Sequence, residues 1–320
     1  MTPNRTRLFC SRSTCEQVIG KEDLHGKVIG ITGTTTGIGT ATARSLALAG
    51  AHVIQINRNK ELSEKQRDEI RFQKPDALVD FVECDLSSLA SVKTAAQVVK
   101  DKGWALNTLI LNAGVIASPQ KETTDGLEPT FGVNHVAHFY LVSLLIPVLR
   151  QNSPSRIVIV SSEGHGHSGL NASKSVEEKV AILMPSPTTT TNSFTLYCYS
   201  KLCNVLFAKR LHRIENGNGV DVYMLHPGSL INTGLSRGWG VWGKAFNAVF
   251  SPFTKSLSQG AATSVYCSIH PDCQGISGKY WDSCWDDEKG LKKVLANDQS
   301  LQDALWSATD HIIQQFEEAH

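Results

Sequence analysis

The stretch Thr32–Gly39 reads TGTTTGIG, and it lies between a short β-rich run and a run of good helix formers. The β-rich run is Val28–Ile31, and the helix-forming run is Ala41–Leu48, which Gly50 stops. A second apolar run, Ala51–Ile56, follows at once. A strand, a glycine turn, a helix and a second strand in this order predict a βαβ unit of a parallel sheet.

The glycines of this turn suit a phosphate ligand. They let the backbone turn tightly and approach a pyrophosphate, whose charge then faces the N-terminus of the helix. A tight turn that binds nothing is the alternative. Because the turn connects a strand to a helix, we predict a dinucleotide site with backbone contacts from Gly33, Thr35, Thr36, Gly37, Ile38 and Gly39.

Further apolar runs continue the alternation of strands and helices. Ala77–Cys84, Leu109–Leu111, Ile157–Val160 and Val220–Leu225 are short and nearly continuous in apolar residues, as in a parallel sheet that is covered on both faces. We predict an α/β fold: a single doubly wound Rossmann domain over residues 25–285, with a mostly parallel sheet of about seven strands and helices on both faces.

The rest of the chain is predicted to flank this domain or to interrupt it. Residues 1–24 are expected to be a flexible N-terminal lead, and residues 286–320 a helical C-terminal tail. Residues 185–193, rich in Pro, Ser and Thr, are predicted to form a surface insertion near the site.

Composition excludes several classes of protein. With 31 Lys and Arg against 30 Asp and Glu, the chain has no broad basic field for nucleic acid. The 8 cysteines form no C-x-x-C pair, which disfavours zinc ribbons and favours a reducing, cytoplasmic location. Residues 1–15 contain Arg5, Arg7 and Arg12 and no acidic residue, as in mitochondrial transit peptides, so mitochondrial targeting is an alternative. No segment approaches the roughly 20 apolar residues of a membrane-spanning helix.

The end of the second strand bears on which dinucleotide binds. NAD sites usually place an acid there, whereas an arginine accommodates the 2′-phosphate of NADP. Residues 56–60 read INRNK, with no acid before Glu61. The sequence therefore favours NADP(H) over NAD(H), with Arg58 as the phosphate contact; an ordinary exposed loop arginine is the alternative.

A tyrosine and a lysine stand four residues apart at Tyr197 and Lys201, which places them on one face of a helix. A neighbouring ammonium stabilises a phenolate and lowers its pKa, so that the phenol can exchange a proton with a carbinol or carbonyl oxygen. Ser161 and Ser162 end the fifth strand, and alternation turns them to opposite faces. We choose Ser162 as the donor to the substrate oxygen; a hydroxyl that bonds only backbone is the alternative.

Together these motifs resemble the short-chain dehydrogenase/reductase family, over about residues 25–285. More narrowly, the chain is similar to the retinol-dehydrogenase-like branch and to the oxidoreductase domains of WW-domain-containing oxidoreductases. The narrower likeness rests on the segments TFGVNH at 130–135, YSKLCN at 199–204, and PFTKS at 252–256 leading into QGAAT at 259–263.

The resemblance implies a role for each matching residue. Tyr197 would be the acid/base, Lys201 would lower its pKa and hold the nicotinamide ribose, and Ser162 would bond the reacting oxygen. Asn134 would anchor a water that relays protons through Lys201. The other implied cofactor contacts are Asp85 and Leu86 at the adenine, Asn112, Ala113 and Gly114 along the cleft, and Pro227, Gly228 and Thr233 beside the nicotinamide.

Three features depart from the family pattern. Tyr197 follows Ser162 at an interval that is long for the wider family, and Leu111 stands where a second Asn is more common. Residues 1–24 contain no Trp, so we expect no WW module there. His165 and His167 are candidate metal ligands. No third ligand stands at a suitable spacing, so we predict no metal site.

An aromatic patch at about residues 236–256 bears on the substrate. It could be a core-facing helix face, a lid over an apolar pocket or a shallow contact with a membrane surface. Its members are Trp239, Trp242, Phe246, Phe250 and Phe253.

The combined motifs predict an NADP(H)-dependent oxidoreductase that interconverts a lipophilic alcohol and its carbonyl, of steroid, retinoid or long-chain type. A catalytically idle dinucleotide-binding scaffold or redox sensor is the second hypothesis, and a sugar-nucleotide epimerase or dehydratase a distant third. Peripheral membrane contact and a homodimer are left open.

Overall fold

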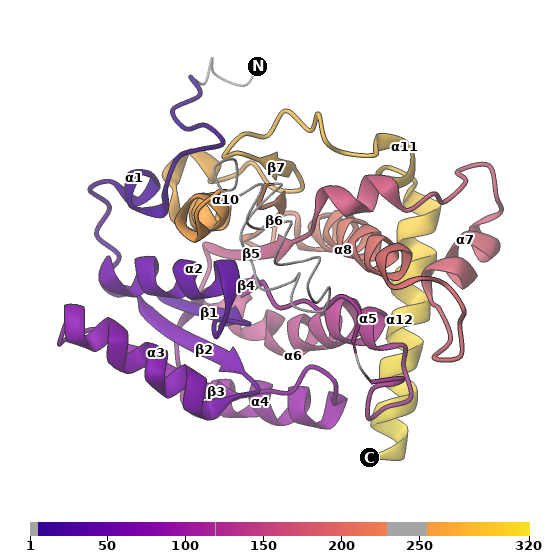
Figure 1. Ribbon diagram of the computed structural model, residues 1–320, viewed down its shortest axis with the longest axis horizontal. Helices are drawn as coiled ribbons and strands as arrows, with labels where there is room; N and C mark the ends of the chain where they lie inside the picture. Colours follow the sequence, from indigo (N-terminus) through magenta and orange to yellow (C-terminus); the bar gives the residue numbers. More distant parts are fainter. Residues whose placement is uncertain (1–5, 119, 229–254) are drawn as a thin grey trace, which may run out of the picture.

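A computed structural model describes residues 6–118, 120–228 and 255–320. In these residues seven strands form one sheet of order β3-β2-β1-β4-β5-β6-β7, and every neighbouring pair is parallel (Figure 1). The order reverses beside β1, which confirms the doubly wound prediction. The strands are β1 (Val28–Thr32), β2 (His52–Asn57), β3 (Val79–Glu83), β4 (Leu106–Leu111), β5 (Ser155–Val160), β6 (Val220–His226) and β7 (Tyr280–Asp282).

Two hydrophobic cores lie on opposite faces of this sheet. Successive residues of a strand point to opposite faces, so Leu109 and Leu111 enter one core while Ile110 enters the other. The first core receives α4 (Leu89–Asp101), α6 (Ala137–Gln151) and α8 (Ser193–Glu215). The second receives α2 (Gly37–Leu48), α3 (Lys60–Gln73) and α10 (Leu257–Ile269). This two-sided burial is why the central strands β1, β4 and β5 are mainly apolar.

The strands are in register at the edge of the sheet where they end. Thr32 of β1 lies opposite Ile56 of β2, which lies opposite Val82 of β3. On the other side, Val160 of β5 lies opposite Leu225 of β6. The residues that follow these strands therefore gather along one edge, although the chain separates them widely.

The N-terminal segment differs from the prediction. Within the region expected to be a flexible lead, α1 (Cys15–Ile19) buries Cys15, Val18 and Ile19 in the second core, beside α2 and α10. The backbone N–H of Cys15 donates to Ser258 Oγ at 3.0 Å. The prediction of a flexible segment is therefore wrong for α1. Three apolar residues in one short helix are too few to give a periodic signal in the sequence, but they are enough to pack against the second core.

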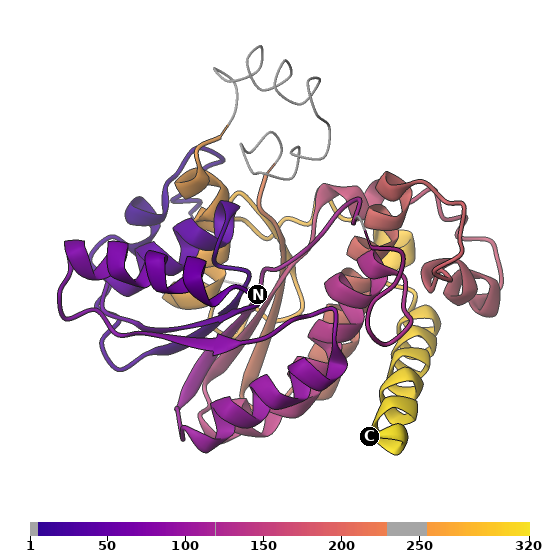
Figure 2. The ribbon, with the colours of Figure 1, turned by 60° about the horizontal axis from the view of Figure 1, so that its bottom comes forward.

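The C-terminal tail is helical, as expected, but it belongs to the domain. In α12 (Gln299–Ala319), Leu301, Leu305, Ile313 and Phe316 are buried in the first core. The helix lies along α8 and α7 (Val176–Leu183), as Figures 1 and 2 show in yellow. Its apolar stripe therefore covers the helical layer, and the short α11 (Lys293–Ala296) leads into it.

Two further segments test predictions made from the sequence. Residues 185–193, between α7 and α8, have no side chain that is fully buried, in agreement with a surface insertion. We predicted that no segment approaches the apolar length of a membrane-spanning helix, but one described segment, Pro129–Gln151, does so by length and composition alone. Of its apolar window, 67% is buried inside the protein. The segment comprises α5 (Pro129–Phe131), a π-helical turn η1 (Gly132–Val136) and α6, and it packs as a core helix.

Candidate active site

The glycine turn between β1 and α2 leaves no space for a side chain at two of its glycines. Gly33 has φ +73°, and a Cβ there would lie 2.8 Å from Ala113 Cα. A Cβ on Gly39 would lie 2.0 Å from Gly33 O. Both contacts are with backbone atoms, so the turn and the start of α2 require glycine at these two positions.

Two buried polar side chains of β2 hold this turn by hydrogen bonds to Thr34. Asn57, at the end of β2, accepts a bond from Thr34 N at 2.8 Å and donates to Thr34 Oγ1 at 2.7 Å. Gln55 Oε1 accepts from Thr34 Oγ1 at 3.0 Å. We did not predict these supporting roles; the available signal was the polar Gln55 and Asn57 next to the apolar Val53, Ile54 and Ile56.

The turn has unused hydrogen-bonding groups that suit a dinucleotide. Thr36 is the N-cap of α2, and its side chain makes no capping bond, so the first N–H groups of the helix remain for an anion. Asn112 Nδ2 donates to Thr32 O and Gly33 O, both at 2.9 Å. Within the described ranges Asn112 Oδ1 is buried without a hydrogen-bond partner. These groups, next to a cradle that a Cβ would fill, fit a pyrophosphate and its adjoining ribose.

Arg58 and Asp85 meet beyond the ends of β2 and β3. Arg58 Nη1 lies 4.0 Å from Asp85 Oδ2, and the arginine side chain is 70% exposed. The other carboxylate oxygen of Asp85 accepts bonds from the backbone N–H and the hydroxyl of Ser87. Leu86 is partly buried beside them. The predicted adenine-end residues are therefore brought together.

Tyr197 and Lys201 project from the first half of α8. Lys201 Nζ lies 5.5 Å from the centroid of the Tyr197 ring and donates to Val160 O at 3.0 Å. The lysine is 3% exposed, and burial lowers the pKa of Lys201 to about 8. Gly114 stands between two elements of the site, because a Cβ there would lie 3.4 Å from both Lys201 Nζ and Asn134 Oδ1.

The pKa of Tyr197 differs from the expectation. We expected Lys201 to lower it, but burial raises the pKa of Tyr197 above its ordinary value, and the hydrogen bond with Ser162 offsets only part of this. The physical reason is that the phenol is removed from water while the ammonium of Lys201 is engaged by Val160 O.

The two serines after β5 point in opposite directions, as the strand alternation predicted. Ser161 Oγ donates to Lys201 O at 2.8 Å and is buried. Ser162 Oγ accepts from Gly164 N at 3.1 Å, and a Cβ on Gly164 would lie 3.4 Å from both Ser162 Oγ and Tyr197 Cε1. Ser162 therefore faces the phenol, and Ser161 faces the backbone.

Asn134 is fully buried in the π-helical turn η1. Its Oδ1 accepts from Val115 N at 2.7 Å, and its Nδ2 donates to Val115 O and to Ser200 Oγ, both at 3.0 Å. The side chain thus ties the loop after β4 to α8. The water-anchoring role stays a prediction.

The far side of the site follows β6. Pro227 and Gly228 come directly after it, and Gly228 has φ +109° with Lys255 packed against it. Thr233 and the aromatic patch from Trp239 to Phe253 lie outside the described residues. In the parts of the chain that the structure describes, no group of three metal-ligating side chains occurs.

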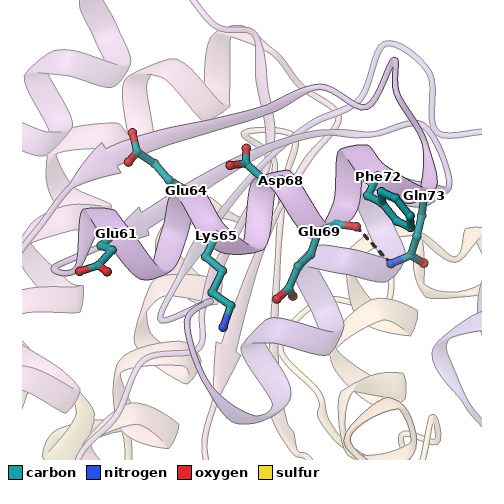
Figure 3. A pocket seen from close by; sticks show the side chains of 7 residues that line it. All are labelled: Glu61, Glu64, Lys65, Asp68, Glu69, Phe72 and Gln73. Atoms are coloured by element: carbon teal, nitrogen blue, oxygen red, sulfur yellow. Dashed lines mark hydrogen bonds between the residues drawn. The ribbon is translucent and has the colours of Figure 1, made fainter.

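A surface hollow lies elsewhere, on the outer face of α3 (Figure 3). All of its lining side chains come from this one helix, and none is a predicted site residue. They are Glu61, Glu64, Lys65, Asp68, Glu69, Phe72 and Gln73.

Comparisons with known proteins show the family to which the chain belongs. The family model described as short chain dehydrogenase matches residues 27–174. A WW domain-containing oxidoreductase of Pongo abelii is 37% identical over 98% of this chain and 74% of its own length. Retinol dehydrogenase 14 of Mus musculus is 35% identical over 91% of this chain and 86% of its own.

A solved structure shares the fold. The 3-ketoacyl-(acyl-carrier-protein) reductase of Brucella melitensis, complexed with NADH, is 25% identical, with a TM-score of 0.60 over 81% of this chain and 97% of that one. The glycine turn, the Ser162–Tyr197–Lys201 cluster and these likenesses lead to one conclusion: the chain is an oxidoreductase of the short-chain dehydrogenase/reductase family.

Proposed function

We propose that this enzyme interconverts a lipophilic alcohol and its carbonyl by direct hydride transfer with NADP(H). The observation that carries the proposal is the closeness of Ser162, Tyr197 and Lys201: a Cβ on Gly164 would lie 3.4 Å from both Ser162 Oγ and Tyr197 Cε1, and Lys201 Nζ lies 5.5 Å from the centroid of the Tyr197 ring. Ser162 follows the end of β5 and the glycine turn follows the end of β1, so both lie at the edge of the sheet where doubly wound folds bind their ligands.

The residues of the site divide the reaction between them. The bound nicotinamide would supply or accept the hydride. Ser162 would hold the reacting oxygen through its hydroxyl, and Tyr197 would give a proton to that oxygen in reduction or remove it in oxidation. Because Lys201 is buried with a pKa of about 8, a small change in its surroundings would change its charge, and its ammonium form would favour the phenolate of Tyr197.

The preference for NADP(H) rests on the adenine end of the site. Arg58 is exposed, stands at the end of β2 and has Asp85 as its nearby carboxylate. A 2′-phosphate would bind the guanidinium in place of this weak, solvent-screened contact. NAD(H) would gain no such bond and would find no acid at the end of β2.

The substrate class rests on the relatives and on the sequence. The retinol dehydrogenases at about a third identity are named for a long apolar alcohol. The aromatic residues at about 236–256, which come after the catalytic helix in the chain, would suit an apolar substrate of similar kind.

Location and assembly are proposed on smaller observations. All eight cysteines are free thiols, which supports a reducing compartment such as the cytoplasm. If the chain forms a homodimer, the contact would use a surface other than the faces of α6 and α8 that α12 covers.

The test is a titration with NADPH and NADH followed by intrinsic tryptophan fluorescence, and then a turnover screen with retinoid, steroid and long-chain carbonyls. Arg58→Ala should weaken NADPH binding at least ten-fold and leave NADH binding unchanged, since one charge-assisted bond contributes about 1.5–3 kcal/mol. Arg67→Ala, which removes an arginine of α3 that pairs with the adjacent Asp68, is the control.

Tyr197→Phe should abolish turnover and preserve the affinity for dinucleotide. Turnover that survives in this variant would overturn the acid/base assignment. A wild-type protein that binds NADPH but consumes it with no carbonyl would favour the idle scaffold or redox sensor instead.

A further inference from the structure

The turn that presents Ser162 is built around one histidine. Ser162 is the N-cap of a 3-10 turn, η2 (Glu163–His167), and its backbone is extended with φ −158°. Within this turn His165 is fully buried. The carbonyl of Ser162 accepts two bonds from His165, one from the backbone N–H at 3.1 Å and one from ring Nδ1 at 2.6 Å.

The second ring nitrogen of His165 has a distant partner. Nε2 accepts from the backbone N–H of Lys292 at 3.2 Å, across 127 positions of the chain. A backbone N–H only donates and a carbonyl only accepts. The two partners therefore settle the tautomer: Nδ1 carries the proton and Nε2 carries the lone pair.

Other side chains close this turn on its remaining sides. The His165 ring packs against Tyr280 of β7, with centroids 5.0 Å apart. His226, at the end of β6, accepts from the backbone N–H of Glu163 at 3.1 Å. The residues on the C-terminal side of Ser162 are thus held to β6, β7 and the segment before α11, while Ser162 Oγ is held by Gly164 N.

We propose that His165 is a positioning residue for Ser162: in its neutral form, with the proton on Nδ1, it fixes the Ser162 carbonyl and so aims the Ser162 hydroxyl at Tyr197. The catalytic role of Ser162 rests on the proposed function above. The imidazole itself contacts no reacting atom. It connects the site to Lys292, and through it to the C-terminal helices.

The proposal implies a dependence on the charge of His165. A second proton would sit on Nε2 and face the N–H of Lys292, so that two donors would oppose each other and this bond would break. The ionisable groups around the ring are Glu163 and His167 on the same turn, His226 from β6 and Tyr280 from β7. Burial lowers the pKa of His165, and His167 adds to this, against the opposite effects of Ser162 and Glu163.

Two isosteric variants separate the two bonds of the ring. In His165→Asn the amide nitrogen lies near the place of Nδ1, so it retains the donor to Ser162 O and loses the acceptor for Lys292. In His165→Gln the amide reaches the place of Nε2, so it retains the acceptor and loses the donor. If the ring positions Ser162, the Asn variant keeps kcat within about 3-fold, and the Gln variant loses about ten-fold or more, with KM for the dinucleotide unchanged.

The exposed His167→Asn, two residues away, is the matched control and should leave kcat unchanged. Equal losses of kcat in the Asn and Gln variants, tracking their stability, would show that His165 only fills space and would overturn the proposal.

Two measurements need no turnover. The ¹⁵N resonances of the wild-type imidazole should show a protonated Nδ1 and an unprotonated Nε2 at pH 7. Exchange of the Gly164 amide, which donates to Ser162 Oγ, should be about ten-fold faster in the Gln variant and unchanged in the Asn variant. The opposite tautomer, or equal exchange in both variants, would overturn the positioning role. Absence of wild-type turnover would overturn the proposed function and leave these two measurements to decide on His165.

Discussion

Replacement of Gly33 by alanine should separate the dinucleotide site from ordinary backbone strain. Gly33 has φ +73°, and an added Cβ would lie 2.8 Å from Ala113 Cα and 2.9 Å from Ala113 Cβ. A left-handed conformation costs a non-glycine residue about 1–2 kcal/mol. The collision with a packed backbone adds about 1–3 kcal/mol, because the loop after β4 has to move. We therefore expect Gly33→Ala to destabilise the protein by about 2–5 kcal/mol.

The matched control is Gly103→Ala. Gly103 has φ +63° with no atom within 4 Å of an added Cβ, so this variant carries the conformational cost alone. Urea unfolding measures both losses, and fluorescence titration with NADPH measures the affinity. Gly103→Ala should lose about 1–2 kcal/mol and bind normally, whereas folded Gly33→Ala should bind at least ten-fold more weakly. Equal stability losses with unimpaired binding in both variants would refute the reasoning about the turn.

Three further predictions follow from the site and its supports. Ser162→Ala should lower kcat by about 10²-fold or more and leave dinucleotide affinity unchanged, whereas Ser161→Ala should cost about 1 kcal/mol in urea unfolding with little change in kcat; the reverse pattern would exchange their roles. Without dinucleotide, a protonated Lys201 is a buried charge. Its pKa of about 8 in the folded protein lies below the ordinary lysine value of 10.5, so the stability of wild type relative to Lys201→Met should rise between pH 7 and pH 10, by about 2 kcal/mol. A difference that stays constant over this range would contradict the burial of Lys201. Finally, Thr309→Val removes the hydroxyl of α12 that bonds His135 Nε2 at 3.1 Å, and should cost about 1–3 kcal/mol by calorimetry or urea unfolding. The exposed Thr94→Val, which has the same bond to the carbonyl one turn back, is its control and should be nearly neutral; similar losses in both would show that α12 is not held at this point.

The sheet and its flanking helices could be read from the sequence because their signals are local. Strands buried on both faces need mainly apolar residues, and β1, β4 and β6 have them. The glycine turn was readable for a similar reason, since positive φ and close backbone contact restrict the choice of residue at Gly33. The short α1 gave no such signal, because its burial depends on the space between α2 and α10.

The same distinction applies to the site. Local patterns in the sequence were enough to predict the groups of the candidate site: a phenol and an amine one helical turn apart on α8, and Ser162 rather than Ser161 by strand alternation. The surroundings of these groups depend on the packed fold. The pKa of Tyr197 is raised because the effect of burial exceeds the lowering effect of Ser162. The role proposed for His165 depends on the bonds of its ring to both Ser162 and Lys292, which only the fold brings together. Burial and pairing over long sequence distances depend on how the layers pack, and no local pattern records them.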